Sequence, residues 1–225
     1  MKKKLVVLTG AGMSAESGIS TFRDSDGLWE KYRVEDVATP EGFAANPELV
    51  LNFYNQRRRE LLNTKPNAGH IGLADLEQEF DVHIITQNID NLHQMAGSKK
   101  VLELHGSVYR NYCMKCGKFY DFSYIKNSAG IPRCQCGGMV KPDVVLYEEG
   151  LDNQILSDSV RAISKAQVLI IGGTSLAVYP AASLIDYFRG DCLVVINKAA
   201  TPRDRNADLL IKDPIGQVFS NIKCV

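Results

Sequence analysis

Four cysteines crowd into one short stretch of the chain and have the spacing of metal ligands. Two residues separate Cys113 from Cys116, one residue separates Cys134 from Cys136, and 17 residues lie between the two pairs. Four thiolates at such spacing suit a tetrahedral zinc ion in a closed, structural site, because a catalytic zinc keeps one position open. We therefore predict one structural zinc. Four ordinary buried cysteines are the alternative.

A glycine-rich turn near the start of the chain has the pattern of a dinucleotide-binding site. Gly10, Gly12 and Ala15 follow an apolar run in the order G-x-G-x-x-A. The glycines permit a tight turn and close approach to a pyrophosphate, and the small third residue lets a helix that starts here pack on the strand. A glycine turn without a nucleotide is the alternative. The acid that holds ribose in dehydrogenases is absent about 20 residues further on, which argues against hydride transfer.

Three further polar residues could carry proton chemistry or order a ligand. His105 follows the apolar run 101–104, where it could act as a general base near neutral pH, although an isolated histidine is more often structural. Asn88 and Asp90 follow the run 82–85. On local grounds, Asp90 could equally well cap a helix.

The elements that must position these residues have the pattern of a parallel sheet. The predicted strands are residues 4–8, 82–85, 168–171 and 193–196. Each is a short apolar run that ends in a polar cluster, as buried parallel strands do. Helical patterns alternate with them at residues 46–62, 67–80, 152–166 and after Pro180. The fold class is therefore α/β, and polar residues at four strand ends predict one extended ligand lying across the sheet.

Composition narrows the class of protein. The 225 residues carry 26 Lys+Arg and 26 Asp+Glu, and this zero net charge argues against a general nucleic-acid binder. No run approaches the roughly 18 apolar residues of a membrane helix, and the apolar stretch after the basic start is too short for a secretory signal. We expect a cytoplasmic protein without a membrane partner, in which clustered cysteines favour metal over disulfides.

Taken together, the motifs resemble the sirtuin family of NAD-dependent protein lysine deacylases. The resemblance runs from about Leu5 to Asn197, and it rests on residues 10–19, 21–23, 86–90, 104–106 and 141–145, the four cysteines and residues 173–175. It implies a Rossmann-like parallel sheet with helices on both faces, plus a small zinc-binding domain. NAD would be a consumed co-substrate, which accounts for the missing ribose acid.

The resemblance also implies a reaction and a set of site residues. The acyl oxygen of an acyl-lysine would attack C1′ of the nicotinamide ribose, and nicotinamide would leave. His105 would be the base that activates a ribose hydroxyl, Asn88 and Asp90 would order the ribose and nicotinamide pocket, and Val145 would contact the peptide substrate. The residues expected around NAD are Gly10, Ala11, Gly12, Ala15, Glu16, Thr21, Phe22, Arg23, Trp29, Gln87, Asn88, Ile89, Asp90, Gly173, Thr174, Ser175, Asn197, Lys198 and Ile215.

A finer resemblance, to class III sirtuins, bears on the acyl group. That class carries Tyr-x-x-Arg on a helix, and here the pair is Tyr54 and Arg57. Residues at i and i+3 share a helix face, so a phenol and a guanidinium could together bind the carboxylate of succinyl- or malonyl-lysine, with small Ala38 leaving room. Alternatively, residues 57–59 are a solvated basic face and Tyr54 is the edge of the core.

Two departures from the family pattern stand out. Ser20 replaces the proline that usually follows Gly-Ile. Tyr147, Glu148 and Glu149 stand where the family commonly has Phe-Gly-Glu, in the segment where the peptide substrate should pair as an added strand. Glu148 could there favour basic residues near the target lysine.

We expect three parts in the chain. Residues 1–30, 81–111 and 141–225 would form the NAD-binding domain, residues 31–80 a helical and lid insertion, and residues 112–140 the zinc module. The expected function is NAD-dependent deacylation (deacetylation, with desuccinylation and demalonylation) of acyl-lysine proteins or peptides, releasing nicotinamide and O-acyl-ADP-ribose. A non-enzymatic NAD or ADP-ribose sensor that binds a partner through its zinc module, and a protein ADP-ribosyltransferase, are the alternatives.

Overall fold

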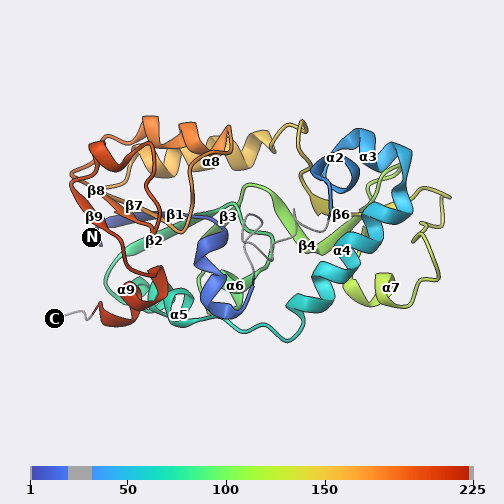
Figure 1. The fold of residues 1–225 in the computed structure, drawn as a ribbon, viewed down its shortest axis with the longest axis horizontal. Coiled ribbons are helices and arrows are strands. Elements are labelled where there is room, and N and C mark those ends of the chain that lie inside the picture. Colours follow the sequence, from blue (N-terminus) through green and yellow to red (C-terminus); the bar gives the residue numbers. More distant parts are fainter. Residues whose placement is uncertain (1, 20–31, 223–225) are drawn as a thin grey trace.

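Two separate sheets organise the chain in the computed structural model, which describes residues 2–19 and 32–222 (Figure 1). The larger sheet is parallel throughout and has the strand order β3-β2-β1-β7-β8-β9. Its strands are β1 (Lys4–Thr9), β2 (Asp81–Thr86), β3 (Val101–Glu103), β7 (Val168–Gly172), β8 (Cys192–Ile196) and β9 (Leu209–Ile211). The four predicted strands are confirmed. The apolar run 101–104, at whose end His105 was expected, contains the edge strand β3. Sequence reasoning missed β9, the three-residue strand at the other edge.

The register of the large sheet brings the ends of its central strands level with one another. Thr9 pairs with Thr86 on one side and with Gly172 on the other, and Gly172 in turn pairs with Ile196. The four segments that follow these strands therefore start from one edge of the sheet, as expected for a ligand site at the carboxyl ends of parallel strands.

Helices cover both faces of the large sheet, because side chains of the central strands point alternately to either side. In β1, Val6 and Leu8 pack in the cluster that includes α8 (Asn153–Ser164) and the 3₁₀ helix η4 (Ala181–Tyr187). Leu5 and Val7 pack in the cluster that includes α5 (Ala68–Asp75) and α9 (Ile215–Asn221). Figure 1 shows α8 above the sheet and α5 and α9 below it.

The predicted helices form with the capping residues that their sequences supply. Asn46 caps α4 (Pro47–Leu61) by accepting a hydrogen bond from the Leu49 N–H, and Asp152 caps α8 in the same way. The predicted helix at 67–80 is α5, followed by one 3₁₀ turn, η3 (Leu76–Gln78). The helix predicted after Pro180 is wrong in type, since η4 is a 3₁₀ helix.

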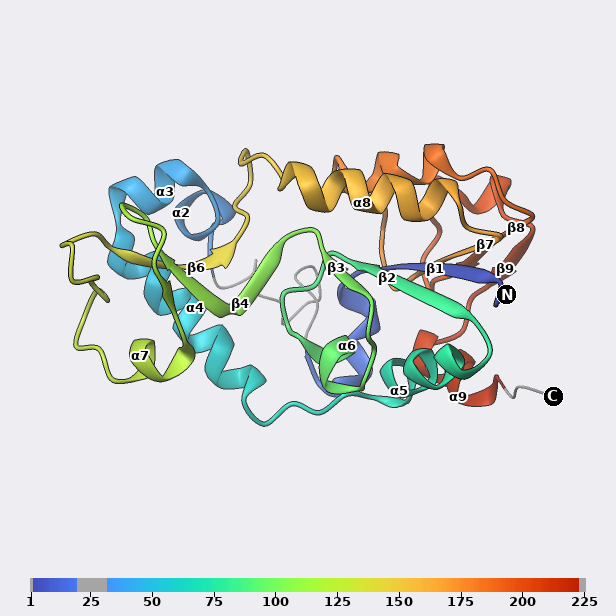
Figure 2. The ribbon, with the colours of Figure 1, turned by 180° about the vertical axis from the view of Figure 1, so that it is seen from behind.

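The smaller sheet is antiparallel, with the order β5-β4-β6, and lies beyond the carboxyl edge of the large one (Figure 2). Its strands are β4 (Gly106–Cys113), β5 (Phe119–Tyr120) and β6 (Val140–Val144), and its helices are α2 (Val34–Val37), α3 (Pro40–Ala45), α4 and α7 (Phe122–Lys126). The predicted domain limits stay a prediction. The small sheet runs beyond 112–140, and α5, from the predicted insertion, packs through Leu73 on residues of β1 and β2.

No helix among residues 2–19 and 32–222 is long and apolar enough to cross a membrane.

Candidate functional site

A cavity of about 640 Å³ lies where the edge of the large sheet meets the small sheet and α4. It brings together residues from the ends of β1, β2, β7 and β8. The predicted site residues that line it are Gly10, Ala11, Gly12, Ala15, Glu16, Tyr54, Arg57, Gln87, Asn88, Ile89, Asp90, His105, Val145, Gly173, Thr174, Ser175, Asn197, Lys198 and Ile215. Thr21, Phe22, Arg23 and Trp29 lie outside the described residues.

The two glycines of the first turn are needed because the end of β7 presses against them. The Gly12 N–H donates to Gly173 O at 2.8 Å, and the Gly10 N–H donates to Gly172 O at 3.3 Å. A Cβ on Gly10 would lie 2.7 Å from the Thr174 Cβ, and one on Gly12 would lie 2.9 Å from the Gly173 Cα. A larger residue would thus push two strand ends apart, whether or not a ligand is bound.

The helix predicted directly after the glycine turn is absent. In its place stand two single 3₁₀ turns, η1 (Ala11–Met13) and η2 (Ala15–Ser17). Glu16 lines the cavity, but its carboxylate accepts the Gly216 N–H at 2.6 Å, close to the start of α9. Glu16 therefore ties the turn to α9, a contact that its place in the motif did not predict.

Asn88 and Asp90 are joined by a third residue, Ser14, to which sequence reasoning assigned no role. The Ser14 hydroxyl donates to Asp90 Oδ2 at 2.6 Å, and Asn88 Nδ2 donates to Ser14 Oγ at 3.1 Å and to Gly10 O at 3.0 Å. Asp90 Oδ1 also accepts the Leu92 N–H at 3.0 Å. This carboxylate therefore stabilises the local turn and also lines the cavity. The position of Ser14 inside the glycine turn, between Gly12 and Ala15, could have indicated that it belongs to the site.

His105 lies at the crossing from β3 to β4 and has the tautomer that a general base requires. Its Nδ1 lies 2.9 Å from the carbonyl oxygen of Gln87. Because a carbonyl only accepts, Nδ1 carries the proton and Nε2 keeps its lone pair. Burial lowers the pKa of His105 below its usual value, and the hydrogen bond to Gln87 opposes this only partly. The imidazole is therefore neutral at pH 7.

Side chains also join the strand ends to one another. Gln87 Nε2 donates to Thr174 Oγ1 at 3.0 Å, which links the end of β2 to the end of β7. The same Thr174 oxygen accepts the Leu176 N–H at 3.2 Å. Asn197 Nδ2 donates to Ala199 O at 2.9 Å, so this side chain closes its own turn at the end of β8. These bonds hold the rim of the cavity in place.

Tyr54 and Arg57 lie one turn apart on α4, and both line the cavity. Tyr54 is buried, and this burial raises the pKa of its phenol well above the usual value, so the hydroxyl stays protonated. The side chain of Arg57 is 11% exposed, and its Nη1 lies 3.2 Å from Glu60 Oε2. A neutral donor and a cation thus face the same space.

The alternative interpretation of residues 57–59 as a solvated basic face is wrong. Arg58 is completely buried; its Nε donates to Val108 O at 2.7 Å and its Nη2 donates to Asn111 Oδ1 at 2.9 Å. Arg57 faces the cavity, and only Arg59 is exposed to solvent. Three consecutive arginines therefore have three different environments.

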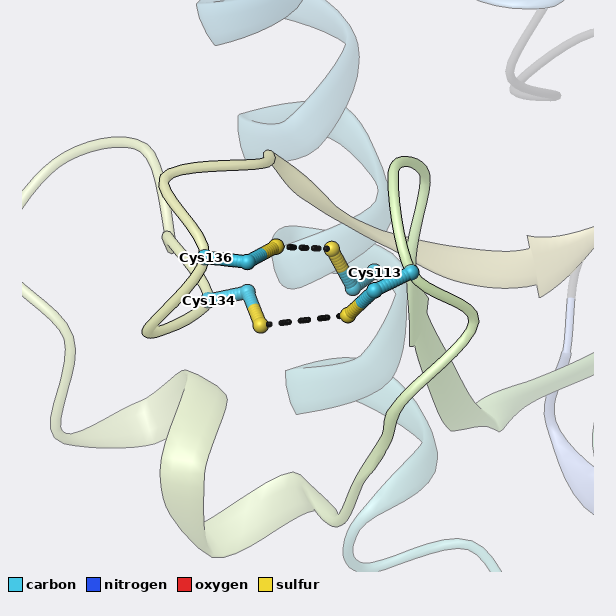
Figure 3. Close-up of side chains that lie close together, drawn as sticks. Cys113, Cys134 and Cys136 are labelled. Carbon is cyan, nitrogen blue, oxygen red and sulfur yellow. Dashed lines mark hydrogen bonds between the residues drawn. The ribbon is translucent and has the colours of Figure 1, made fainter.

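The four clustered cysteines converge as the sequence predicted (Figure 3). All four sulfurs lie within 4.8 Å of one another, with Cys113 and Cys136 at 3.5 Å and Cys116 and Cys134 at 3.5 Å. Four sulfurs around a tetrahedral zinc, with Zn–S distances of about 2.3 Å, lie about 3.8 Å apart. The cluster therefore fits one zinc ion with a closed, all-sulfur shell.

The backbone around the cysteines favours the thiolate form that a metal needs. The pKa of Cys134 is lowered to about 6, first of all by the Cys136 backbone N–H, and the Lys115 N–H donates to Cys113 Sγ at 3.4 Å. The neighbouring sulfurs raise the pKa of Cys116 to about 12, against the backbone N–H of Lys118. A Cβ on Gly138 would lie 2.7 Å from Cys113 Sγ. Only glycine fits at position 138, because the Cys113 sulfur packs against it.

A parallel sheet with a glycine turn at its carboxyl edge, joined to a small four-cysteine module, defines a nucleotide-binding protein of the α/β class. Residues 10–180 match the model of the Sir2 family. The chain belongs to the Sir2 family, which is the family that its motifs resemble.

Relatives with solved structures or assigned names match nearly the whole chain. An NAD-dependent protein deacetylase of Clostridium perfringens is 53% identical, over 97% of this chain and 92% of that protein. An NAD-dependent protein deacylase of Bacteroides thetaiotaomicron is 50% identical, over 82% and 80%. A Sir2 homolog–NAD complex has a TM-score of 0.89 at 41% identity, over 97% and 87%. A Sir2–p53 peptide–NAD⁺ complex has a TM-score of 0.85 at 37% identity, over 97% and 91%.

Proposed function

We propose that the protein is an NAD-dependent protein lysine deacylase that releases nicotinamide and O-acyl-ADP-ribose. One observation carries this proposal: a neutral His105 with a free Nε2 lines the same cavity as the glycine turn and the Asn88–Ser14–Asp90 group. The names of the deacetylases and deacylases to which the chain is similar support it.

The residues present fit NAD as a consumed co-substrate. The turn at Gly10 and the ends of β7 and β8, with Thr174 and Asn197, would hold the adenosine and diphosphate portions. When bound, NAD supplies a ribose carbon that can be attacked as nicotinamide leaves. Asn88 and Asp90 are fixed by hydrogen bonds before any ligand arrives, so they can order a ribose at little entropic cost.

His105 would remove one proton from a hydroxyl group in the cavity. Its Nε2 is the nitrogen that can accept a proton, and the positive charge that develops on the ring is stabilised by the bond from Nδ1–H to Gln87 O. Val145 donates its N–H to His105 O at 3.1 Å, which ties the histidine to the segment after β6. The base and the expected peptide segment are thus parts of one hydrogen-bonded unit.

We further propose that acyl groups ending in a carboxylate are accepted. Tyr54 and Arg57 would bind the carboxylate of succinyl- or malonyl-lysine, the phenol as a donor and the guanidinium as a charge-assisted donor. Ala38 lines the same space with only a methyl group, which leaves room for the longer chain.

The decisive experiment measures nicotinamide release from NAD with matched acetyl-, malonyl- and succinyl-lysine peptides, and identifies the products by mass spectrometry. The proposal requires peptide-dependent release with an O-acyl-ADP-ribose product. Release without deacylation, with ADP-ribose on the protein acceptor, would instead identify an ADP-ribosyltransferase. NAD binding without any release would identify a sensor.

A further inference from the structure

The rim of the cavity carries a glutamate in a conformation that favours glycine. Glu148 has φ = 71°, which places it in the left-handed region, and it is exposed at the cavity. The family commonly has glycine in this place. The chain therefore tolerates an unfavourable backbone conformation in order to present a carboxylate here, and such outliers often mark functional positions.

Three other carboxylates of the cavity are already engaged, and a fourth, Asp213, lies two residues before α9, which Glu16 bonds to the glycine turn. Glu149 Oε2 accepts the Leu146 N–H at 2.7 Å and lies 3.7 Å from Lys141 Nζ. Asp90 is bonded to Ser14, and Glu16 is bonded to Gly216. No salt bridge joins Glu148 to another residue of the ranges 2–19 and 32–222, so its charge is available to a ligand.

A large aromatic side chain lines the same cavity and is mostly exposed to solvent. Tyr179 precedes Pro180, just before η4, and 76% of its surface is accessible. A carboxylate and an open aromatic ring are the two groups that bind an ammonium or guanidinium in proteins, by ion pairing and by cation–π contact. Two long basic side chains line the cavity: Arg57, whose Nη1 lies 3.2 Å from Glu60 Oε2, and Lys198, which follows β8 in the part assigned above to adenosine.

We propose that Glu148 and Tyr179 make the enzyme selective for protein segments that carry a lysine or arginine beside the acyl-lysine. This inference rests on the proposed deacylase function and names its class of peptide substrate. The glycine turn would hold the nucleotide, and the Tyr147 N–H donates to Ala38 O at 2.8 Å, beside the space proposed for the acyl chain. Glu148 is the next residue, so a peptide that delivers the acyl-lysine should pass it. A basic neighbour of the acyl-lysine would there meet an unpaired negative charge.

Peptide binding, rather than turnover, tests this proposal. Fluorescence anisotropy would compare two labelled acetyl-lysine peptides that differ only in flanking residues, arginine in one and glutamine in the other. The wild type should bind the basic peptide about two- to five-fold more tightly at low salt, as expected for one exposed ion pair. The difference should vanish in 0.5 M salt, since screening removes such pairs.

Three variants complete the experiment. E148Q keeps the length and backbone of Glu148, and it should bind both peptides equally. Y179L should reduce the preference. E79Q removes an exposed carboxylate outside the cavity and should keep the preference, which excludes a general effect of net charge.

An E148Q variant that retains the preference, or a wild type without one, would overturn the proposal. If Y179L keeps the full preference for the basic peptide, Tyr179 does not contribute to the selectivity. Nicotinamide release is measured separately, so a failure of the deacylase assignment remains distinguishable from a failure of the specificity assignment.

Discussion

Arg110 and Glu103 form an ion pair across the point where the chain crosses from the large sheet to the small one. Arg110 Nη1 lies 2.5 Å from Glu103 Oε2 at the end of β3, and Arg110 Nε lies 2.8 Å from Asp143 Oδ2 in β6. His105 lies on the crossing between the paired residues. The pair therefore braces the segment that carries the proposed base.

Replacing Arg110 should destabilise the protein more than replacing an arginine in an exposed ion pair. R110Q leaves the Glu103 carboxylate, 7% exposed, without its cation. We expect a loss of about 2 kcal/mol, less than the roughly 3–5 kcal/mol for a fully buried pair, because Arg110 itself is partly exposed. Urea unfolding measures it. R161Q breaks the exposed pair with Asp158 and should cost less than about 1 kcal/mol; similar losses in the two variants would refute the bracing role.

Removing the proposed base should separate binding from catalysis. H105A should retain NAD binding in calorimetry and lose turnover by roughly 10²- to 10⁴-fold. Because burial lowers the pKa of His105, the neutral, active form should persist to lower pH than for a free histidine. The acid limb of kcat/KM in the wild type should therefore lie below pH 6.5. Near-normal turnover in H105A would show that another group is the base.

Acyl selectivity should depend on the pair on α4. Y54F combined with R57M removes both donors to the acyl carboxylate. Activity on succinyl-lysine should fall roughly ten- to hundred-fold more than activity on acetyl-lysine, as expected for hydrogen bonds to a charged group. R59M is the matched control, since Arg59 is exposed on the same helix. Equal losses on both substrates would argue that the pair only supports packing.

Two buried histidines should make the fold sensitive to acid. His70 in α5 and His93 in α6 (Leu92–Met95) are fully buried, with ring centroids 4.8 Å apart, and burial lowers their pKa to about 4 and about 3. A histidine in the unfolded chain has a pKa near 6.5. Below this pH the unfolded chain therefore binds protons at these histidines, whereas the native protein does not until the pH is much lower.

Stability should therefore be complete above pH 6.5 and fall as the pH drops towards 4, by up to about 1.4 kcal/mol per pH unit for each histidine. Urea unfolding at several pH values measures this slope. H93Q can keep a hydrogen bond to Thr9, which lies 3.0 Å from His93 Nε2, and should flatten the curve. An unchanged slope in H93Q would assign the acid sensitivity to other groups.

The cysteine cluster should bind one zinc ion per chain, and the small sheet should depend on it. Metal analysis of the purified protein and thermal unfolding after chelation measure both effects. C134S should lose the metal and lower the melting temperature, because Cys134 supplies a buried sulfur. C192S, at a half-buried cysteine in β8, should keep the zinc content of the wild type. Full stability after chelation would contradict a structural zinc.

The central strands and long helices could be predicted because their signals are local. Apolar runs defined β1, β2, β7 and β8, and Asn46 and Asp152 marked the starts of α4 and α8. The edge strand β9 was not predicted, because its apolar run of three residues between Asp208 and Lys212 is shorter than the runs of the central strands. The helical pattern after Pro180 was correct in its buried positions but did not separate a 3₁₀ from an α-helix.

The predicted site residues that the structure describes, apart from the cysteines, line one cavity, but the motifs did not predict which groups each side chain would bond. That Glu16 binds Gly216, 200 residues away, depends on how α9 folds back onto the turn. Ser14 escaped notice as the link between Asn88 and Asp90 for the same reason. The burial of Arg58 could likewise not be predicted from its neighbours in the sequence, because its partners Val108 and Asn111 lie in β4.

The burial of Arg58 sets a limit on how this enzyme can be redesigned. Its guanidinium bonds α4 to β4, the strand that begins just after His105, so the helix proposed to bind the acyl group and the proposed base are held in one packed unit. Libraries that vary Tyr54 and Arg57 can search for new acyl groups while the base stays in place. Libraries that run through the whole arginine triplet would mix changes of specificity with loss of that anchor.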